Sequence, residues 1–216
     1  MKTYFYIFVI CGAIASIFYT LSTSVNGINF KISSFMFMHT GILVSTAMIG
    51  LYLFFKDRMP YLSFKLSALF LFISGIMHSI MTTMQSSNAV WYRRLRDTIN
   101  NEDLANYKNT AIGVFSSQLG IDYAFDLFMS SGLFFLAYAI LKSNLFGKIV
   151  PVLGLLISSL GYTFNSVAFP SNPEDYGLLD PGPFFSGWFG LFIIMAIVLY
   201  KKGKFNTVEK GLIANS

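Results

Sequence analysis

Apolar residues in this chain come in six long blocks separated by polar segments. The blocks cover residues 4–21, 34–55, 62–84, 121–141, 149–169 and 183–200. A helix needs about 20 residues to cross the hydrocarbon core of a bilayer. In lipid such a segment must be helical, because its backbone N–H and C=O groups have no water to bond. The pattern predicts an all-α, polytopic membrane protein: one domain, residues 1–216, with six transmembrane helices in a bundle.

Composition agrees with a membrane protein and argues against several other classes. Only 12% of the residues are charged, whereas a soluble chain carries about 25%. The net charge of +5 comes mainly from residues at the ends of the blocks, so it does not indicate a nucleic-acid partner. Cys11 is the single cysteine and excludes an internal disulfide. The chain has no nucleotide-binding loop, nucleophile elbow or zinc-type cysteine pair.

The basic residues predict an orientation in the membrane. With six spans, both termini and the second and fourth connections share one side, which carries ten lysines and arginines against five on the other side. Because cytoplasmic loops are enriched in Lys and Arg, we expect a multi-pass protein of the cytoplasmic membrane with both termini in the cytoplasm. The cluster of Arg93, Arg94 and Arg96 argues against this orientation, because it lies in the longest connection, on the predicted outer side.

The two long connections on the outer side are expected to be ordered. Residues 85–120 predict a lid of interfacial helices: Asn88 is placed to cap one helix, and Asn100 or Asn101 another. Residues 170–182 are rich in proline and glycine, which predicts an outer cap made of turns.

Five polar residues inside the apolar blocks form the candidate site. They are placed toward the outer ends of their predicted helices, and ionisable groups in a hydrocarbon core are costly, at least about 2.5–3.5 kcal/mol each on insertion scales. Five at similar depth on four helices predict a ligand-binding pocket under the two outer connections. Its predicted residues are His39, His78, Asp122, Asp126 and Asn165.

Several chemistries fit parts of this set, and the sequence leaves them open. His39, His78 and Asp126 could bind a divalent metal. Met36 lies three residues before His39, and Met81 three after His78, so copper also fits. Haem fits less well, because each helix offers a single histidine. The alternative is that the histidines and aspartates only pair with one another across helices.

The last third of the chain resembles a family of bacterial polytopic membrane proteins of unknown function. The similarity lies in the segment 120–126 (GIDYAFD), in Phe146-Gly147, in Phe169-Pro170 and in the segment 176–183 (YGLLDPGP). It covers about residues 120–200 and implies a bacterial membrane fold without implying a reaction.

Three functions follow from these observations. The leading prediction is an integral membrane protein that binds a small ligand or substrate in a polar pocket in the outer half of the bundle. The second is an accessory subunit of a larger membrane complex. The third is a metal-dependent membrane hydrolase, whose metal would activate water.

Overall fold

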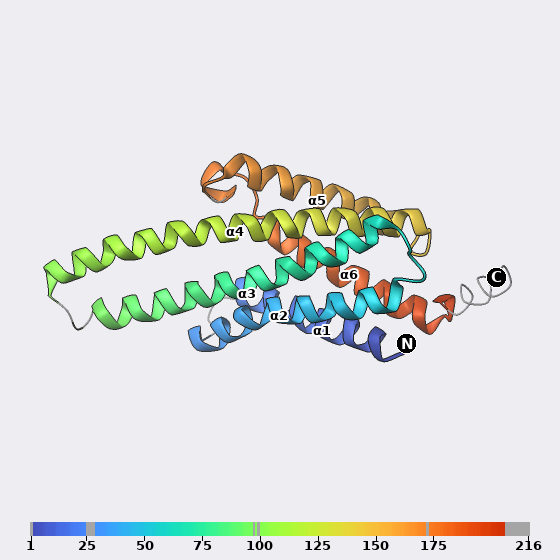
Figure 1. The fold of residues 1–216 in the computed structure, drawn as a ribbon, viewed down its shortest axis with the longest axis horizontal. Helices are drawn as coiled ribbons and strands as arrows, with labels where there is room; N and C mark the ends of the chain where they lie inside the picture. The colour runs from blue at the N-terminus through green and yellow to red at the C-terminus, as the bar shows by residue number, and fades with distance from the viewer. Residues whose placement is uncertain (1, 25–28, 97, 99, 172, 206–216) are drawn as a thin grey trace.

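The computed structural model describes residues 2–24, 29–96, 98, 100–171 and 173–205, and within these ranges the secondary structure is entirely helical. Six α-helices and one short 3₁₀ helix follow one another along the chain (Figure 1). They are α1 (Lys2–Ser24), α2 (Phe30–Phe55), α3 (Leu62–Arg96), α4 (Asn101–Ser143), α5 (Ile149–Ala168), η1 (Pro173–Tyr176) and α6 (Gly182–Lys201). All six α-helices are long and apolar enough to cross a membrane.

The helix ends follow the expected turn chemistry. Pro60 follows the turn that closes α2, where the Phe55 carbonyl accepts the Arg58 and Met59 N–H groups. Asn144 ends α4 in the left-handed conformation, at φ 54°, and Gly147 follows it at φ 69°. Asn100 caps α4, because its side chain accepts the Asp103 N–H at 2.8 Å. The cap at Asn100 confirms one of the two positions predicted for the start of this helix, Asn100 or Asn101.

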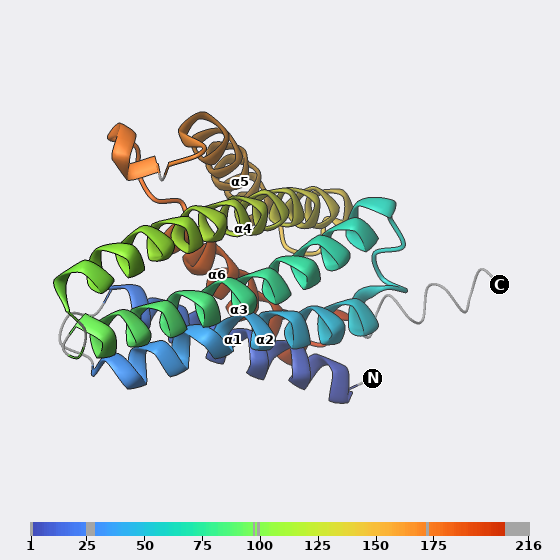
Figure 2. The same cartoon turned by 60° about the vertical axis from the view of Figure 1, so that its left-hand side comes forward.

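The predicted helix break near Asn88 is wrong. Residues 85–96 continue α3 and residues 101–120 begin α4, so the segment expected as separate interfacial helices belongs to two long helices. At 1.5 Å per residue, the 35 residues of α3 and the 43 of α4 measure about 52 and 64 Å. A bilayer core is about 30 Å thick. Figure 1 shows this α3–α4 hairpin extending well beyond the other helices, and Figure 2 shows it turned toward the viewer.

The six helices contact one another in a ring. Each packs against its neighbours in sequence, and α6 closes the ring by packing against both α5 and α1. The outward faces carry large apolar side chains at high exposure, among them Ile10 at 55%, Ile42 at 57% and Leu156 at 56%. Soluble monomers rarely expose apolar surface on this scale, so these faces suit contact with lipid.

Five buried phenylalanine side chains fill the space between the helices at one end. Phe8, Phe54, Phe55, Phe192 and Phe205 are buried there at 2% exposure or less, and they contact one another edge to face or tilted. We call this set the aromatic plug. It lies at the end where α1 begins and α6 finishes, opposite the tip of the α3–α4 hairpin (Figure 1).

Small residues allow the closest helix contacts. A Cβ built on Gly41 of α2 would collide with the Gly75 carbonyl of α3, and one on Gly75 would collide with the Ser45 hydroxyl. Glycines of α4 and α5 also make room for side chains of other helices. Gly154 makes room for Trp188 of α6 as well as Ala137 of α4, and Gly132 of α4 packs on Leu71 of α3.

Candidate functional site

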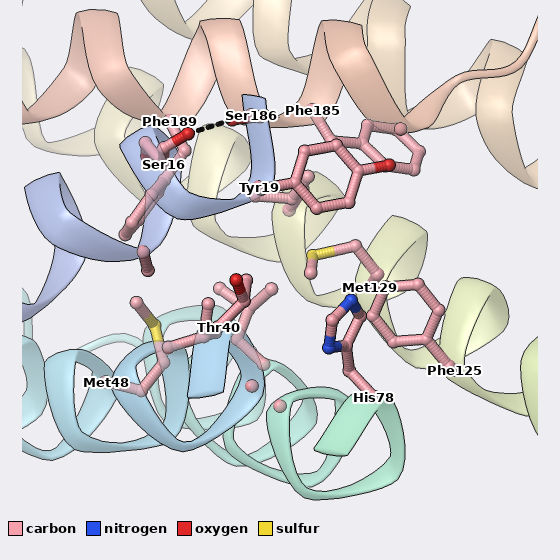
Figure 3. Close-up of a pocket in the computed structure, with 17 residues that line it drawn as sticks. Ser16, Tyr19, Thr40, Met48, His78, Phe125, Met129, Phe185, Ser186 and Phe189 are labelled. Atoms are coloured by element: carbon pink, nitrogen blue, oxygen red, sulfur yellow. Dashed lines mark hydrogen bonds between the residues drawn. The ribbon is translucent and has the colours of Figure 1, made fainter. Parts of the chain in front are cut away.

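A hollow opens inside the ring of helices on the hairpin side of the aromatic plug. It measures about 610 Å³ including its open part, of which about 60 Å³ is wide enough to take a water molecule. Its walls come from α1, α2, α3, α4 and α6. His78, Tyr19, Thr40, Phe125, Met129 and Phe185 are among the side chains that line it (Figure 3).

His78 is the polar centre of this hollow. Its side chain is 2% exposed, and neither ring nitrogen has a hydrogen-bond partner among the residues that the structure describes. The rings of Tyr19, Phe37 and Phe125 surround it, with centroids 6.3, 4.9 and 5.0 Å from the imidazole centroid. A neutral imidazole carries one N–H donor and one lone-pair acceptor. A buried polar group left unsatisfied costs about 1–3 kcal/mol, so both atoms suit a bound hydrogen-bonding group.

Two of the other hydroxyl groups in the hollow already donate hydrogen bonds to backbone carbonyls. The Thr40 hydroxyl donates to the Met36 carbonyl at 3.0 Å, one turn back in α2. The Ser186 hydroxyl donates to the Ser16 carbonyl at 3.5 Å, which ties α6 to α1 (Figure 3). No Asp, Glu, Lys or Arg is among the described residues that line the hollow. A charged occupant would therefore be buried without a counter-charge, which is strongly unfavourable.

The structure places His39 at the predicted depth but on another face. The depth agrees because the Ser79 hydroxyl, next to His78 in sequence, donates to the Met38 carbonyl at 3.1 Å. The His39 ring instead lies against Phe35, with centroids 4.1 Å apart, and its Nδ1 bonds the Phe35 carbonyl at 2.8 Å. His39 does not line the hollow, so the two imidazoles do not converge on one ligand.

The predicted carboxylates and amide lie on the neighbouring faces of α4 and α5. Asp122 and Asp126 are half-buried on α4, and each has an interaction partner. Asn165 is 4% exposed on α5, and its Nδ2 has no hydrogen-bond partner in the described part of the chain. The contact between the Tyr123 and Phe169 rings, 4.3 Å apart, sets the register and brings Asn165 level with Asp126. Neither Asp126 nor Asn165 lines the hollow.

The predicted metal ligands are not gathered. Within residues 2–24, 29–96, 98, 100–171 and 173–205, no three His, Cys, Asp or Glu side chains lie together as they would around a metal ion. His39, His78 and Asp126 are therefore not gathered as the predicted ligands of one divalent ion in the described part of the chain. The thioethers in the hollow are Met48 and Met129, whereas the copper hypothesis relied on Met36 and Met81.

Sequence reasoning missed most of the residues around His78. Tyr19, Phe125 and Phe185 look like ordinary apolar-helix residues, and only the helix packing brings them to one hollow. Gln118 of α4 is another buried polar residue within an apolar helix. It is 2% exposed, and its Oε1 has no partner among the described residues. An amide inside an apolar helix is a signal that deserved more weight.

Comparison with known proteins adds no identification. No protein-family model, curated protein or solved structure matches this chain. Functional inference therefore rests on the hollow and its chemistry.

Proposed function

We propose that this chain is a multi-pass membrane protein whose six helices form a bundle and whose central hollow binds a small, uncharged, mostly apolar molecule through His78. The observation that supports it is the His78 imidazole, which is buried and has two unpartnered nitrogens in a hollow walled by carbon. Ligand pockets commonly combine apolar walls with a few well-placed polar groups.

The ligand's chemistry follows from the lining. One hydroxyl or carbonyl group on the ligand would bond a ring nitrogen of His78, inside the part of the hollow that is wide enough for a water molecule, about 60 Å³. The apolar remainder of the ligand would lie against Phe125, Phe185 and Met129, which line the same hollow. A role as a subunit of a larger complex stays a prediction.

Native mass spectrometry of protein extracted from its own membrane tests this function. The wild-type chain should keep a small, uncharged adduct that His78→Phe loses, because phenylalanine fills the space without offering a hydrogen bond. His39→Phe is the matched control, since His39 bonds only its own helix, and it should keep the adduct. Equal adducts in both variants, or none in the wild type, would refute the proposal.

Nitrogen NMR provides an independent readout, because the chain has only two histidines. In protein labelled with ¹⁵N-histidine, removal of the bound molecule should move the His78 ring signals and leave those of His39 in place. If neither pair moves, the molecule lies elsewhere.

We propose further that both termini are cytoplasmic and that the α3–α4 hairpin projects on the outer side. Cys11→Ser gives a cysteine-free background. In it, a cysteine at Asn109 should react with an impermeant thiol reagent in intact cells, and one at Asp57 should react only after lysis. The opposite pattern would reverse the orientation.

A further inference from the structure

A second depression lies between α4 and α5, apart from the His78 hollow. It measures about 600 Å³ including its open part, of which about 310 Å³ is wide enough for water. Only hydroxyl-bearing and phenylalanine side chains line it: Ser130, Ser131, Phe134, Phe135, Ser158, Ser159, Tyr162 and Thr163. We call it the α4–α5 groove; it shares no residue with the hollow.

Ser130 shows that the groove is more than a row of small residues. It is 1% exposed, and its hydroxyl has no hydrogen-bond partner in the described part of the chain. Elsewhere in these helices, hydroxyls such as those of Thr40, Thr82 and Ser158 donate to a carbonyl one turn back. Ser130 makes no such bond although its helix offers one, so its donor is available to an occupant of the groove.

The ends of the groove limit the shape of that occupant. On one side, the rings of Tyr123 and Phe169 close the gap between α4 and α5. On the other, a Cβ built on Gly154 would lie 2.8 Å from the Ala137 Cβ. Between these contacts the lining residues cover only about two helical turns, roughly 11 Å. This length suits a compact molecule.

Depth and charge limit its chemistry. The 20 residues of α5 measure about 30 Å, which matches a bilayer core, and Ser158 lies at the middle of the helix. Phospholipid headgroups lie about 15 Å away from that level. No charged side chain lines the groove among the described residues. The occupant must therefore be uncharged, soluble in hydrocarbon, and able to hydrogen-bond at the centre of the membrane.

We propose that the α4–α5 groove is a second ligand site, which binds an uncharged, lipid-soluble molecule through a hydroxyl or carbonyl group that bonds Ser130. The rings of Phe134 and Phe135 provide its apolar wall. The site is open to the bilayer because Phe134 and Tyr162 are 39% and 48% exposed.

Photolabelling tests this site in the full chain reconstituted in phosphatidylcholine bilayers. The probe is an eight-carbon alcohol that carries a diazirine, and the control probe is the same molecule without its hydroxyl. Peptide mapping should place the alcohol's label on residues 130–135 and 158–163, with weaker labelling by the control probe. Equal labelling by both probes, or label spread evenly over the lipid-facing residues, would overturn the proposal.

Matched variants separate binding from misfolding. Ser130→Ala should lower labelling of the groove about threefold, the effect of one average intramembrane hydrogen bond, and Ser116→Ala in the hairpin should not change it. Ser159→Leu blocks the groove from its exposed side, so it should remove the label without disturbing buried packing. Undiminished labelling in Ser159→Leu counts against the site.

A neighbouring helix in the groove is the alternative occupant. In the Cys11→Ser background, a cysteine at position 159 would then form a disulfide between chains, and the groove would take no label. That result would overturn the proposal.

Discussion

Replacing Gly41 with alanine tests the tight contact between α2 and α3. The added methyl group would collide with the Gly75 carbonyl and lie 2.5 Å from the Ser79 hydroxyl and 2.8 Å from the Ser79 nitrogen. All three neighbours belong to α3, and two of them are backbone atoms that cannot rotate away. The two helices must therefore separate.

The expected cost can be worked out from what that separation disturbs. Overpacking a tight contact costs about 1–3 kcal/mol. Two hydrogen bonds between α2 and α3 would weaken, Ser79 to the Met38 carbonyl at 3.1 Å and Ser45 to the Phe72 carbonyl at 2.9 Å, each worth about 0.6 kcal/mol in a membrane. Alanine returns about 1 kcal/mol of helix propensity. Gly41→Ala should lower the free energy of unfolding by about 1–3 kcal/mol.

Unfolding of the purified chain in mixed micelles, titrated with a denaturing detergent, measures this change. Gly187→Ala is the matched control, because a Cβ on this α6 glycine meets nothing within 4 Å, and it should stabilise by about 0.5–1 kcal/mol. If Gly41→Ala is as stable as Gly187→Ala, the α2–α3 crossing is looser than described and the reasoning fails.

Three further predictions concern single side chains. His78→Phe should raise the free energy of unfolding of the ligand-free chain by about 1–3 kcal/mol, because it removes two unsatisfied buried polar atoms; a loss of stability in the same detergent titration would show that the imidazole is satisfied. Asn100→Ala should speed hydrogen exchange at the first amides of α4 and cost about 1 kcal/mol locally, while Asn88→Ala, inside α3, should leave exchange unchanged; equal exchange in both variants would argue against the cap. Trp188→Phe should lower the thermal midpoint through loss of the 2.8 Å bond from its Nε1 to the Val150 carbonyl, worth about 1 kcal/mol; an unchanged midpoint would show that this bond adds nothing.

The sequence predicts helices well because bilayer-length apolar blocks leave the backbone little choice. The turns at Pro60 and Asn144 follow from local chemistry, because proline cannot continue a helix and asparagine tolerates the left-handed conformation. The sequence does not locate the distal ends of α3 and α4, because residues 85–120 are polar enough to suit either interfacial helices or a projecting hairpin. Polarity does not indicate the direction in which a helix continues.

The sequence predicts the depth of the candidate site residues and does not predict which face of the helix each one lies on. Depth along a helix follows from counting residues, so His39 and His78 were placed at one level, and the structure agrees. The face that each residue presents depends on how the helices pack, and here His39 lies against Phe35. The sequence also does not show that the Ser130 hydroxyl lacks a partner among the described residues, so it does not indicate the α4–α5 groove.

The aromatic plug has an electrical consequence. Phe8, Phe54, Phe55, Phe192 and Phe205 are buried at one end of the described helices and do not line the His78 hollow, so we expect them to block a water path from the hollow to that end. Under the proposed function, such a chain would exchange its ligand with one side of the membrane without a leak of ions or protons. Reconstituted in a planar bilayer, it should carry no current above the lipid background. Replacing Phe192 with alanine is the most direct way to ask whether the plug maintains that insulation.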